Sequence, residues 1–241
     1  MYIVSYNAIS LAIKEKRFWK SVQRKIGQYL IDGCGDFVVT RRPRWLPDDT
    51  VISTEEHDYI RFATLELICQ EIIKRSIPGN IAELGVYRGD FSRVMNYYFP
   101  DRKLYLFDTF EGFDGRDTIV DKEKKLSTAN QDFSETSVDY VLSRMEFPEC
   151  CIVKKGYFPA TGADVNDIFA LVSLDVDLYA PILSGLEFFY PKLASGGMMI
   201  IHDFGNANYL GVSRAVREYA DKNSIGYVCL PDECGSVVIV K

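Results

Sequence analysis

The sequence lacks the features that mark membrane-spanning, exported or nucleic-acid-binding proteins. No apolar run approaches the roughly 20 residues that a membrane-spanning helix needs. The first apolar stretch is short and broken by polar residues, and its basic residues follow it, unlike those of a signal peptide. A net charge of -6 argues against a nucleic-acid partner, because phosphate binding needs a basic face. We expect a cytoplasmic protein that binds neither nucleic acid nor membrane.

The sequence also lacks paired cysteines. It contains no CxxC, and its six cysteines show no spacing typical of metal ligands: Cys34, Cys69, Cys150, Cys151, Cys229 and Cys234. Several of them lie in apolar runs, which predicts buried, reduced thiols. With 241 residues and 47% hydrophobic residues, the chain is long enough for one domain with a sizeable core and a short extension.

Residues 1–53 are predicted to form a helical amino-terminal extension, and residues 54–241 the main domain. The basic run Lys14–Arg24 suits either a membrane-surface helix or the solvated face of a helix that packs against its own domain or a second subunit. We favour packing, so a homodimer is an expectation. His57, in the stretch EEHDY, is expected to be a surface or capping residue.

Strand-like and helix-like segments alternate along the main domain. The expected strands are Ile81–Leu84, Lys103–Phe107, Cys151–Lys154, Ile168–Leu174, Gly197–Ile201, Gly226–Leu230 and Ser236–Val240. The expected helices are Thr54–Arg75, opening at Ser53 or Thr54, then Phe91–Tyr98, Ser137–Phe147, Ala180–Leu193 and Gly211–Lys222. This alternation predicts an α/β fold with a doubly wound, mostly parallel, seven-stranded sheet. The connection between the last two strands is too short for a crossover helix, so these should pair antiparallel.

The first candidate site is a glycine turn after the first expected strand. Glu83 precedes Gly85, and Gly89 follows within the same turn. Ligands of doubly wound sheets bind outside the carboxyl ends of the strands, where glycines allow the backbone to approach closely. The pattern is not the GxGxxG of dinucleotide-binding proteins, and the acidic residue suits a ligand with a cationic end, such as an amino-acid ammonium. A turn without a ligand is the alternative.

The second candidate is Asp108, which ends the apolar segment Leu104–Phe107. It lies about 20 residues beyond the glycine turn, a spacing that places a carboxylate at the tip of the neighbouring strand, within reach of ribose hydroxyls. An exposed loop aspartate is the simpler interpretation. Taken with Glu83, however, Asp108 indicates a nucleoside that carries an amino acid, which describes S-adenosylmethionine.

The third candidate is a group of acidic residues at two later strand ends. Asp175 and Asp177 follow one apolar strand, and His202 and Asp203 follow the next. Several carboxylates in one crevice need a cation or a raised pKa to coexist, and Mg²⁺ prefers oxygen ligands. We therefore expect a magnesium site here, although some of these residues are open to simpler roles as helix caps or ion-pair partners.

From about Thr54 to the carboxyl terminus the chain resembles the macrocin O-methyltransferase family, whose members are S-adenosylmethionine- and magnesium-dependent and methylate hydroxyls of natural-product sugars or aglycones. The residues that carry the resemblance are ELGVYRGDFS (83–92), LYLFDTFEGF (104–113), KGYFPAT (155–161), SLDVDLYAPILSGLEFFYPKLASGGMMIIHDF (173–204) and GVSRAV (211–216). The block from Asp175 to Asp203 is the most specific of these.

The resemblance implies a role for each matched position. The methionine part of the cofactor would be held by Glu83, Gly85, Tyr87, Arg88, Gly89 and Ser92, the ribose by Asp108, and the adenine by Gly156 and Tyr157. Asp175 would be the general base or a metal ligand, and Asp177 and Asp203 would be metal ligands. The acceptor is expected to be a small-molecule hydroxyl. Its identity has no readable motif.

The chain departs from the family pattern at two positions. Val176 stands where relatives commonly have glycine, and His202 where they commonly have an aspartate. The histidine leaves three interpretations open: a metal site with fewer carboxylates, a catalytic histidine that removes the acceptor's proton, or a structural histidine. A catalytically silent relative that binds S-adenosylmethionine and a nucleotide-binding oxidoreductase are the alternative functions.

Overall fold

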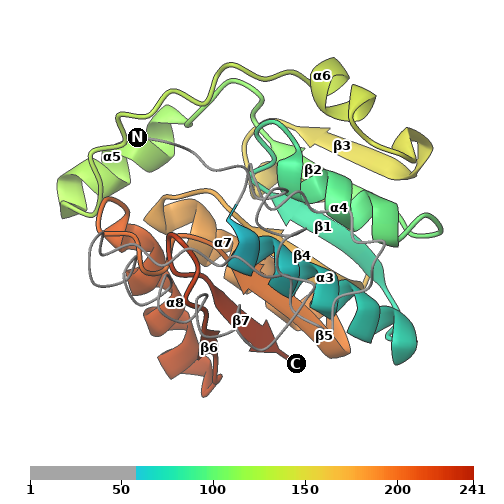
Figure 1. Ribbon diagram of the computed structural model, residues 1–241. Coiled ribbons are helices and arrows are strands. Elements are labelled where there is room, and N and C mark those ends of the chain that lie inside the picture. The colour runs from blue at the N-terminus through green and yellow to red at the C-terminus, as the bar shows by residue number, and fades with distance from the viewer. Residues whose placement is uncertain (1–57) are drawn as a thin grey trace, which may run out of the picture. The chain divides into compact units, whose positions relative to one another are not determined.

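The computed structural model describes residues 58–241 (Figure 1). The predicted extension 1–53, its boundary with the main domain, the Lys14–Arg24 run and His57 lie outside the described residues. No helix within residues 58–241 is both long and apolar enough to cross a membrane.

Strands and helices alternate as expected from the sequence. The strands are β1 (Asn80–Leu84), β2 (Leu104–Asp108), β3 (Cys151–Lys155), β4 (Phe169–Leu174), β5 (Leu193–Ile201), β6 (Val228–Cys229) and β7 (Val237–Val240). The α-helices are α3 (Tyr59–Lys74), α4 (Asp90–Tyr98), α5 (Gly115–Lys124), α6 (Val138–Ser143), α7 (Tyr179–Phe189) and α8 (Leu210–Asn223). Three short 3₁₀ turns are η1 (Pro148–Cys150), η2 (Ala160–Gly162) and η3 (Tyr190–Lys192).

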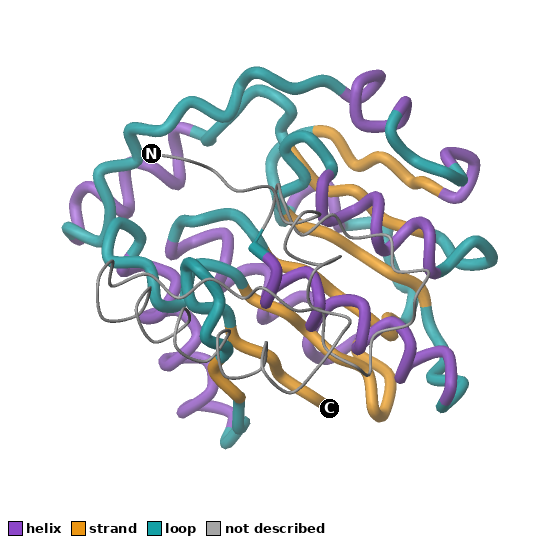
Figure 2. Tube along the Cα trace, in the orientation of Figure 1, coloured by secondary structure: helices purple, strands orange, loops and turns teal. Residues whose placement is uncertain are grey.

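The seven strands form one sheet in the order β3-β2-β1-β4-β5-β7-β6, a single layer between helices (Figure 2). Strands β1 to β5 pair in parallel, whereas β7 pairs antiparallel with both β5 and β6. The predicted doubly wound sheet with an antiparallel last strand is therefore confirmed. The strand order reverses direction between β1 and β4, which is the position where open α/β sheets bind their ligands.

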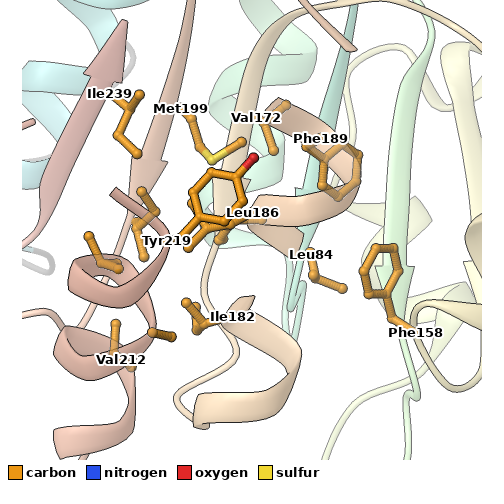
Figure 3. Close-up of a cluster of buried hydrophobic side chains, with 14 of the residues drawn as sticks. Leu84, Phe158, Val172, Ile182, Leu186, Phe189, Met199, Val212, Tyr219 and Ile239 are labelled. Carbon is orange, nitrogen blue, oxygen red and sulfur yellow. The ribbon is translucent and has the colours of Figure 1, made fainter. Parts of the chain in front are cut away.

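Each face of the sheet has its own apolar core, because successive strand residues point to opposite sides. On one face Ile182, Leu186 and Phe189 of α7 and residues of α8 pack against the central strands. Figure 3 shows these side chains meeting Val172, Met199 and Ile239 from the sheet. On the other face the apolar sides of α3, α4 and α6 cover β1, β2 and β4.

The first described helix starts later than predicted. Asp58, and not Ser53 or Thr54, caps α3, since its carboxylate accepts hydrogen bonds from the backbone N–H groups of Ile60 and Arg61. Asp58 fills the capping position that the prediction assigned to an earlier polar residue. The helix therefore delivers Arg61, in its first turn, to the cavity described below.

Two further expectations need correction. No helix was expected between Tyr98 and Ser137, yet this part of the chain contains α5, which is capped by the Asp114 carboxylate and has Asp117 and Asp121 buried. The cysteines of the described chain are free, but only Cys69 is buried; Cys229 is exposed, and the others are partly buried. Their positions in apolar runs did not predict this, because Cys229 lies on the short edge strand β6.

Candidate active site

A cavity of about 550 Å³ opens at the carboxyl ends of the parallel strands. Residues that follow β1, β2, β3, β4 and β5 all line it, together with α3, the start of α5 and the turn before β7. The sequence-predicted residues Glu83, Asp108, Tyr157, Asp175 and Asp203 therefore share one cavity. Parallel strands bring this about, since their carboxyl ends meet at one edge of the sheet.

Glu83 lies at the floor of this cavity. Its side chain is almost completely buried and accepts a short hydrogen bond from the hydroxyl of Ser92 in α4. Burial raises the pKa of Glu83 to about 8, and the hydrogen bond from Ser92 only partly opposes this. The charge of Arg61 also lowers this pKa, but no ion pair with Glu83 occurs among residues 58–241. The buried carboxyl is therefore poised to take up the charge of a ligand ammonium.

The turn after β1 needs glycine at two positions, because the backbone there has a positive φ. Gly85 has a φ of +88°, and a Cβ placed on it would lie 1.9 Å from the carbonyl oxygen of Asp175. Gly89, with a φ of +77°, caps α4, and its N–H donates to the carbonyl of Val86 at 2.8 Å. Gly85 thus brings the backbone against the end of β4, whereas Gly89 lies against Val141 and Met145.

Asp108 fixes this turn. One carboxylate oxygen accepts from the N–H groups of Val86 and Tyr87, at 2.7 and 2.9 Å, and the other accepts from the N–H of Phe110 at 2.7 Å. A carboxylate has about four lone-pair sites. Three of them accept from the backbone, so Asp108 can accept from one ribose hydroxyl more readily than from both. Asp108 therefore has a structural role beside the predicted binding role.

Arg88 and Tyr87 are engaged with the segment that follows α5. The Arg88 guanidinium donates to the carboxylate of Glu135 at 2.9 Å, and both side chains are substantially exposed. The Tyr87 ring packs edge-on against Phe133 at 5.3 Å between centroids. Both residues line the cavity, but the charge of Arg88 is already paired at the rim.

The far end of the cavity is formed by the turn after β3. Gly156 has a φ of +128°, and its N–H donates to the carbonyl of Asp108 at 2.9 Å. The neighbouring Tyr157 ring lies under the guanidinium of Arg116, 3.4 Å from the ring centroid, and its hydroxyl is 3.4 Å from the carboxylate of Asp117. Burial raises the pKa of Asp117 to about 6. This aromatic and acidic wall suits a flat base with an amino group.

Asp175 is held by two cationic groups. One carboxylate oxygen accepts from the Arg61 guanidinium at 2.7 Å, and the other lies 3.0 Å from Nδ1 of His202. Burial favours the neutral acid, but Arg61 and His202 outweigh it and hold the pKa of Asp175 well below its usual range. Burial likewise opposes the charged form of His202, yet Asp175 and Asp203 raise its pKa to about 10.

Asp177 and Asp203 form a second pair beside the first. Both have a left-handed backbone, with φ of +57° and +59°, which aspartate tolerates better than most residues. Burial, a hydrogen bond with Asp203 and the charge of Asp175 raise the pKa of Asp177 well above its usual range. Asp203 also lies 2.8 Å from Nδ1 of His202 and accepts from the Asn206 amide at 2.6 Å.

Two overlapping groups of side chains have the chemistry to hold a metal ion. In the first, the carboxylates of Asp175, Asp177 and Asp203 each offer one oxygen within 4.8 Å of the others. In the second, His202, Asp203 and Cys234 offer a nitrogen, an oxygen and a sulfur within the same distance. The oxygen donors match the expected magnesium ligands in type, although Asp175 is already paired with Arg61.

Two residues of the site, Arg61 and Cys234, were not predicted from the sequence. Arg61 reaches Asp175 across 114 positions of the chain, and its guanidinium also lies 4.5 Å from the centroid of the Phe91 ring. Cys234 lies in the turn before β7 and reaches the cavity because β7 pairs with β5. The basic residue in the first turn of an otherwise apolar helix was the one available signal for Arg61.

Replacing Asp175 with asparagine is expected to destabilise the fold by about 3 kcal/mol, because breaking a buried ion pair leaves the partner charge unpaired. The side chain of Arg61 is 12% exposed, so water can partly solvate the unpaired charge, and the expected loss lies at the low end of the roughly 3–5 kcal/mol that a broken buried ion pair costs. Chemical unfolding measures the change. Asp164→Asn breaks the exposed pair with Lys154 and should change the stability far less, because water screens the charges of an exposed pair. Equal losses in the two variants would contradict a stabilising role for the buried pair.

The chain is similar to known O-methyltransferases in sequence and in fold. The macrocin-O-methyltransferase (TylF) family matches residues 52–228. Mycinamicin III 3''-O-methyltransferase of Micromonospora griseorubida is 27% identical over 179 residues, 68% of this chain and 69% of that protein. The 8-demethyl-8-(2,3-dimethoxy-alpha-L-rhamnosyl)-tetracenomycin-C 4'-O-methyltransferase of Streptomyces olivaceus is 29% identical over 160 residues. That match covers 60% of each protein, so the chain spans less than two thirds of that relative's length.

Two solved structures share the fold. The O-methyltransferase NovP superposes with a TM-score of 0.65 at 22% identity, over 75% of this chain and 79% of that one. The calicheamicin methyltransferase CalS11 does so with a TM-score of 0.62 at 17% identity, over 100% of this chain and 98% of that one. Since the family match takes in α3, the glycine turn and the acidic strand ends, the chain belongs to the macrocin-O-methyltransferase (TylF) family.

Proposed function

We propose that the protein transfers a methyl group from S-adenosylmethionine to a hydroxyl of a small molecule, of the sugar or natural-product type. The observation that carries this is one cavity with a donor end, formed by Glu83 and Asp108, and an acidic end, formed by Asp177 and Asp203. Two relatives are O-methyltransferases of a rhamnosyl-tetracenomycin C and of mycinamicin III. The family membership disfavours the oxidoreductase alternative.

At the donor end, Glu83 receives the methionine ammonium and Asp108 a ribose hydroxyl. The turn from Gly85 to Gly89 supplies a backbone surface for the methionine, and Tyr157 with Asp117 receives the adenine. Arg88 closes the rim through Glu135, so we assign it to ordering the turn in preference to direct contact with the methionine carboxylate.

At the acidic end we assign the general base to Asp177 in preference to Asp175. Asp175 is committed to Arg61 and His202, whereas no ion pair with Asp177 occurs among residues 58–241. In the reaction the hydroxyl oxygen bonds the methyl carbon and the sulfonium sulfur keeps the electron pair of the broken bond. The hydroxyl proton goes to the ionised form of Asp177, whose raised pKa makes it a stronger base than an ordinary carboxylate. Holding the two reactants in line supplies much of the rate.

The donor chemistry of the converging side chains supports a divalent cation at this end of the cavity. If oxygen ligands alone hold the ion, Asp177, Asp203 and Asp175 would bind magnesium. When bound, such a cation lowers the pKa of an acceptor hydroxyl. His202, with its pKa raised to about 10, keeps its proton in the absence of a cation and is assigned to holding Asp175 and Asp203 in place.

Calorimetric titration tests the cofactor assignment. We expect S-adenosylmethionine to bind with and without a divalent cation, and NAD not to bind. Tight NAD binding without S-adenosylmethionine binding would overturn the proposal. A methyl-transfer assay over glycosylated natural products then separates an active enzyme from a catalytically silent relative, which would bind the donor and methylate no acceptor.

The affinity for S-adenosylmethionine is expected to rise by up to about tenfold between pH 6 and pH 7. The pKa of Glu83 is raised to about 8 in the free protein, and the carboxyl must ionise to pair with the ammonium. Binding therefore releases a proton, and a higher pH favours binding because it favours the loss of this proton. Titrations in buffers of different ionisation enthalpy measure this release. Glu83→Gln should bind more weakly and lose the pH dependence. A flat profile in the unmodified protein would exclude the pairing.

A further inference from the structure

Cys234 lies at the acidic end of the cavity, beside the histidine that departs from the family pattern. His202 and Asp203 follow β5, and the antiparallel pairing of Ile201 with Val237 brings the turn before β7 to the same strand end. The N–H of Gly205 donates to the carbonyl of Cys234 at 3.0 Å, which fixes the two segments side by side. The amide of Asn206 reaches both the Cys234 sulfur, at 3.8 Å, and the Asp203 carboxylate.

These side chains differ in donor type from a magnesium site. His202, Asp203 and Cys234 offer a nitrogen, an oxygen and a sulfur, all within 4.8 Å of one another. Thiolate and imidazole ligands select borderline ions such as Zn²⁺ and Co²⁺, whereas Mg²⁺ takes oxygen ligands. Catalytic zinc sites commonly have three protein ligands and keep one position open. The nitrogen and the sulfur donors therefore both favour a borderline ion over Mg²⁺.

The competing all-oxygen group is weakened by Arg61. Its guanidinium donates to one oxygen of Asp175 at 2.7 Å, and the other oxygen lies 3.0 Å from His202. A hard cation that used Asp175 would have to displace one of these cationic partners. Asp203 belongs to both groups, so the two modes of metal binding exclude each other at this residue.

We propose that this cavity binds a borderline divalent ion of the Zn²⁺ type through His202, Asp203 and Cys234, in preference to Mg²⁺. A role for the ion in methyl transfer rests on the proposed function, whereas metal binding does not. Binding itself is measurable without turnover.

Cobalt titration of the full-length, metal-free protein tests the ligand set. Co²⁺ bound by a thiolate gives a sulfur-to-cobalt charge-transfer band in the near ultraviolet, which carboxylate ligands do not produce. We expect this band in the unmodified protein and in Cys229→Ser, where the altered cysteine is exposed on β6. We expect Cys234→Ser to lose it, and to lose Zn²⁺ affinity by more than the roughly 10–100-fold that an outer-shell change costs.

Competition and a second variant complete the test. Zn²⁺ should displace Co²⁺ at stoichiometric concentration, and a large excess of Mg²⁺ should not. His202→Asp should move the preference toward Mg²⁺. Absence of the band, its persistence in Cys234→Ser, or displacement of Co²⁺ by Mg²⁺ as readily as by Zn²⁺ would overturn the proposal. S-adenosylmethionine titration of the same samples checks the fold of each variant, and its failure in the unmodified protein would instead refute the proposed function.

Discussion

Replacing Gly85 with alanine is expected to destabilise the fold by about 2–5 kcal/mol and to remove measurable S-adenosylmethionine binding. The backbone at Gly85 has a φ of +88°, and left-handed conformations cost a residue with a Cβ roughly 1–2 kcal/mol. The added Cβ would also lie 1.9 Å from the carbonyl oxygen of Asp175. Forced overlap in a packed interior costs a further 1–3 kcal/mol or so, and relief of the overlap moves either the donor turn or the acidic strand end.

Thermal unfolding and donor titration measure the two effects. The loss of stability corresponds to a fall in Tm of roughly 4–20 °C for a protein of this size. Gly115→Ala and Gly226→Ala are matched controls, because a Cβ at either position would have no neighbour within 4 Å, and each should stay within about 0.5 kcal/mol of the parent. A Gly85 variant as stable as these controls would show that the turn has more freedom than the geometry allows.

The sheet was predictable from the sequence because its strands are buried on both faces. Segments such as Leu104–Phe107 and Phe169–Leu174 are almost continuously apolar, as parallel strands between helices are, and the helical patterns between them imply crossovers. Strand ends then converge without further information, so Glu83, Asp108 and Asp175 were correctly expected in one crevice. The position of β7 between β5 and β6 was not readable, since sequence adjacency alone pairs only β6 with β7.

The helix α5 was missed because its stabilising contacts are not apolar. Its sequence is GRDTIVDKEK, which has little apolar periodicity. It forms on a capping carboxylate, Asp114, and on Asp121, whose side chain accepts from the backbone N–H of Tyr179 at 3.0 Å. Tertiary hydrogen bonds of this kind override local propensity, and no periodicity records them.

The predicted site residues were those that belong to a local motif, and the missed ones depend on tertiary structure. Glu83 is in strand β1 and Ser92 is in the helix α4 that follows it, so their pairing is a local consequence of the strand–turn–helix motif. The ion pair of Arg61 with Asp175 and the approach of Cys234 to His202 depend on how α3 and the β7 turn pack. These contacts change the chemistry assigned to Asp175 from a free base to a partner of two cations.

Replacing Asp177 with asparagine is expected to lower the rate of methyl transfer by about 10²–10⁴-fold, the usual contribution of a general base. The affinity for S-adenosylmethionine should stay within a few-fold, because the donor end is formed by other residues. Asparagine is the appropriate replacement, since Asp177 has a φ of +57° and asparagine tolerates this conformation better than alanine does. The amide also keeps the volume, and its NH₂ group can donate to the Asp203 carboxylate as the protonated Asp177 carboxyl does, so the pairing with Asp203 is retained.

Single-turnover methyl transfer and donor titration, measured together, separate this role from that of Asp175. Asp164→Asn, at an exposed carboxylate outside the cavity, should leave both quantities unchanged. Asp175→Asn should lose stability as well as rate, because Arg61 then has no anionic partner of its own, whereas Asp177→Asn should lose rate alone. An Asp177→Asn protein that retains most of its rate, beside an inactive but stable Asp175→Asn protein, would return the base to Asp175. The ion pair with Arg61 would then be one that the acceptor displaces on binding.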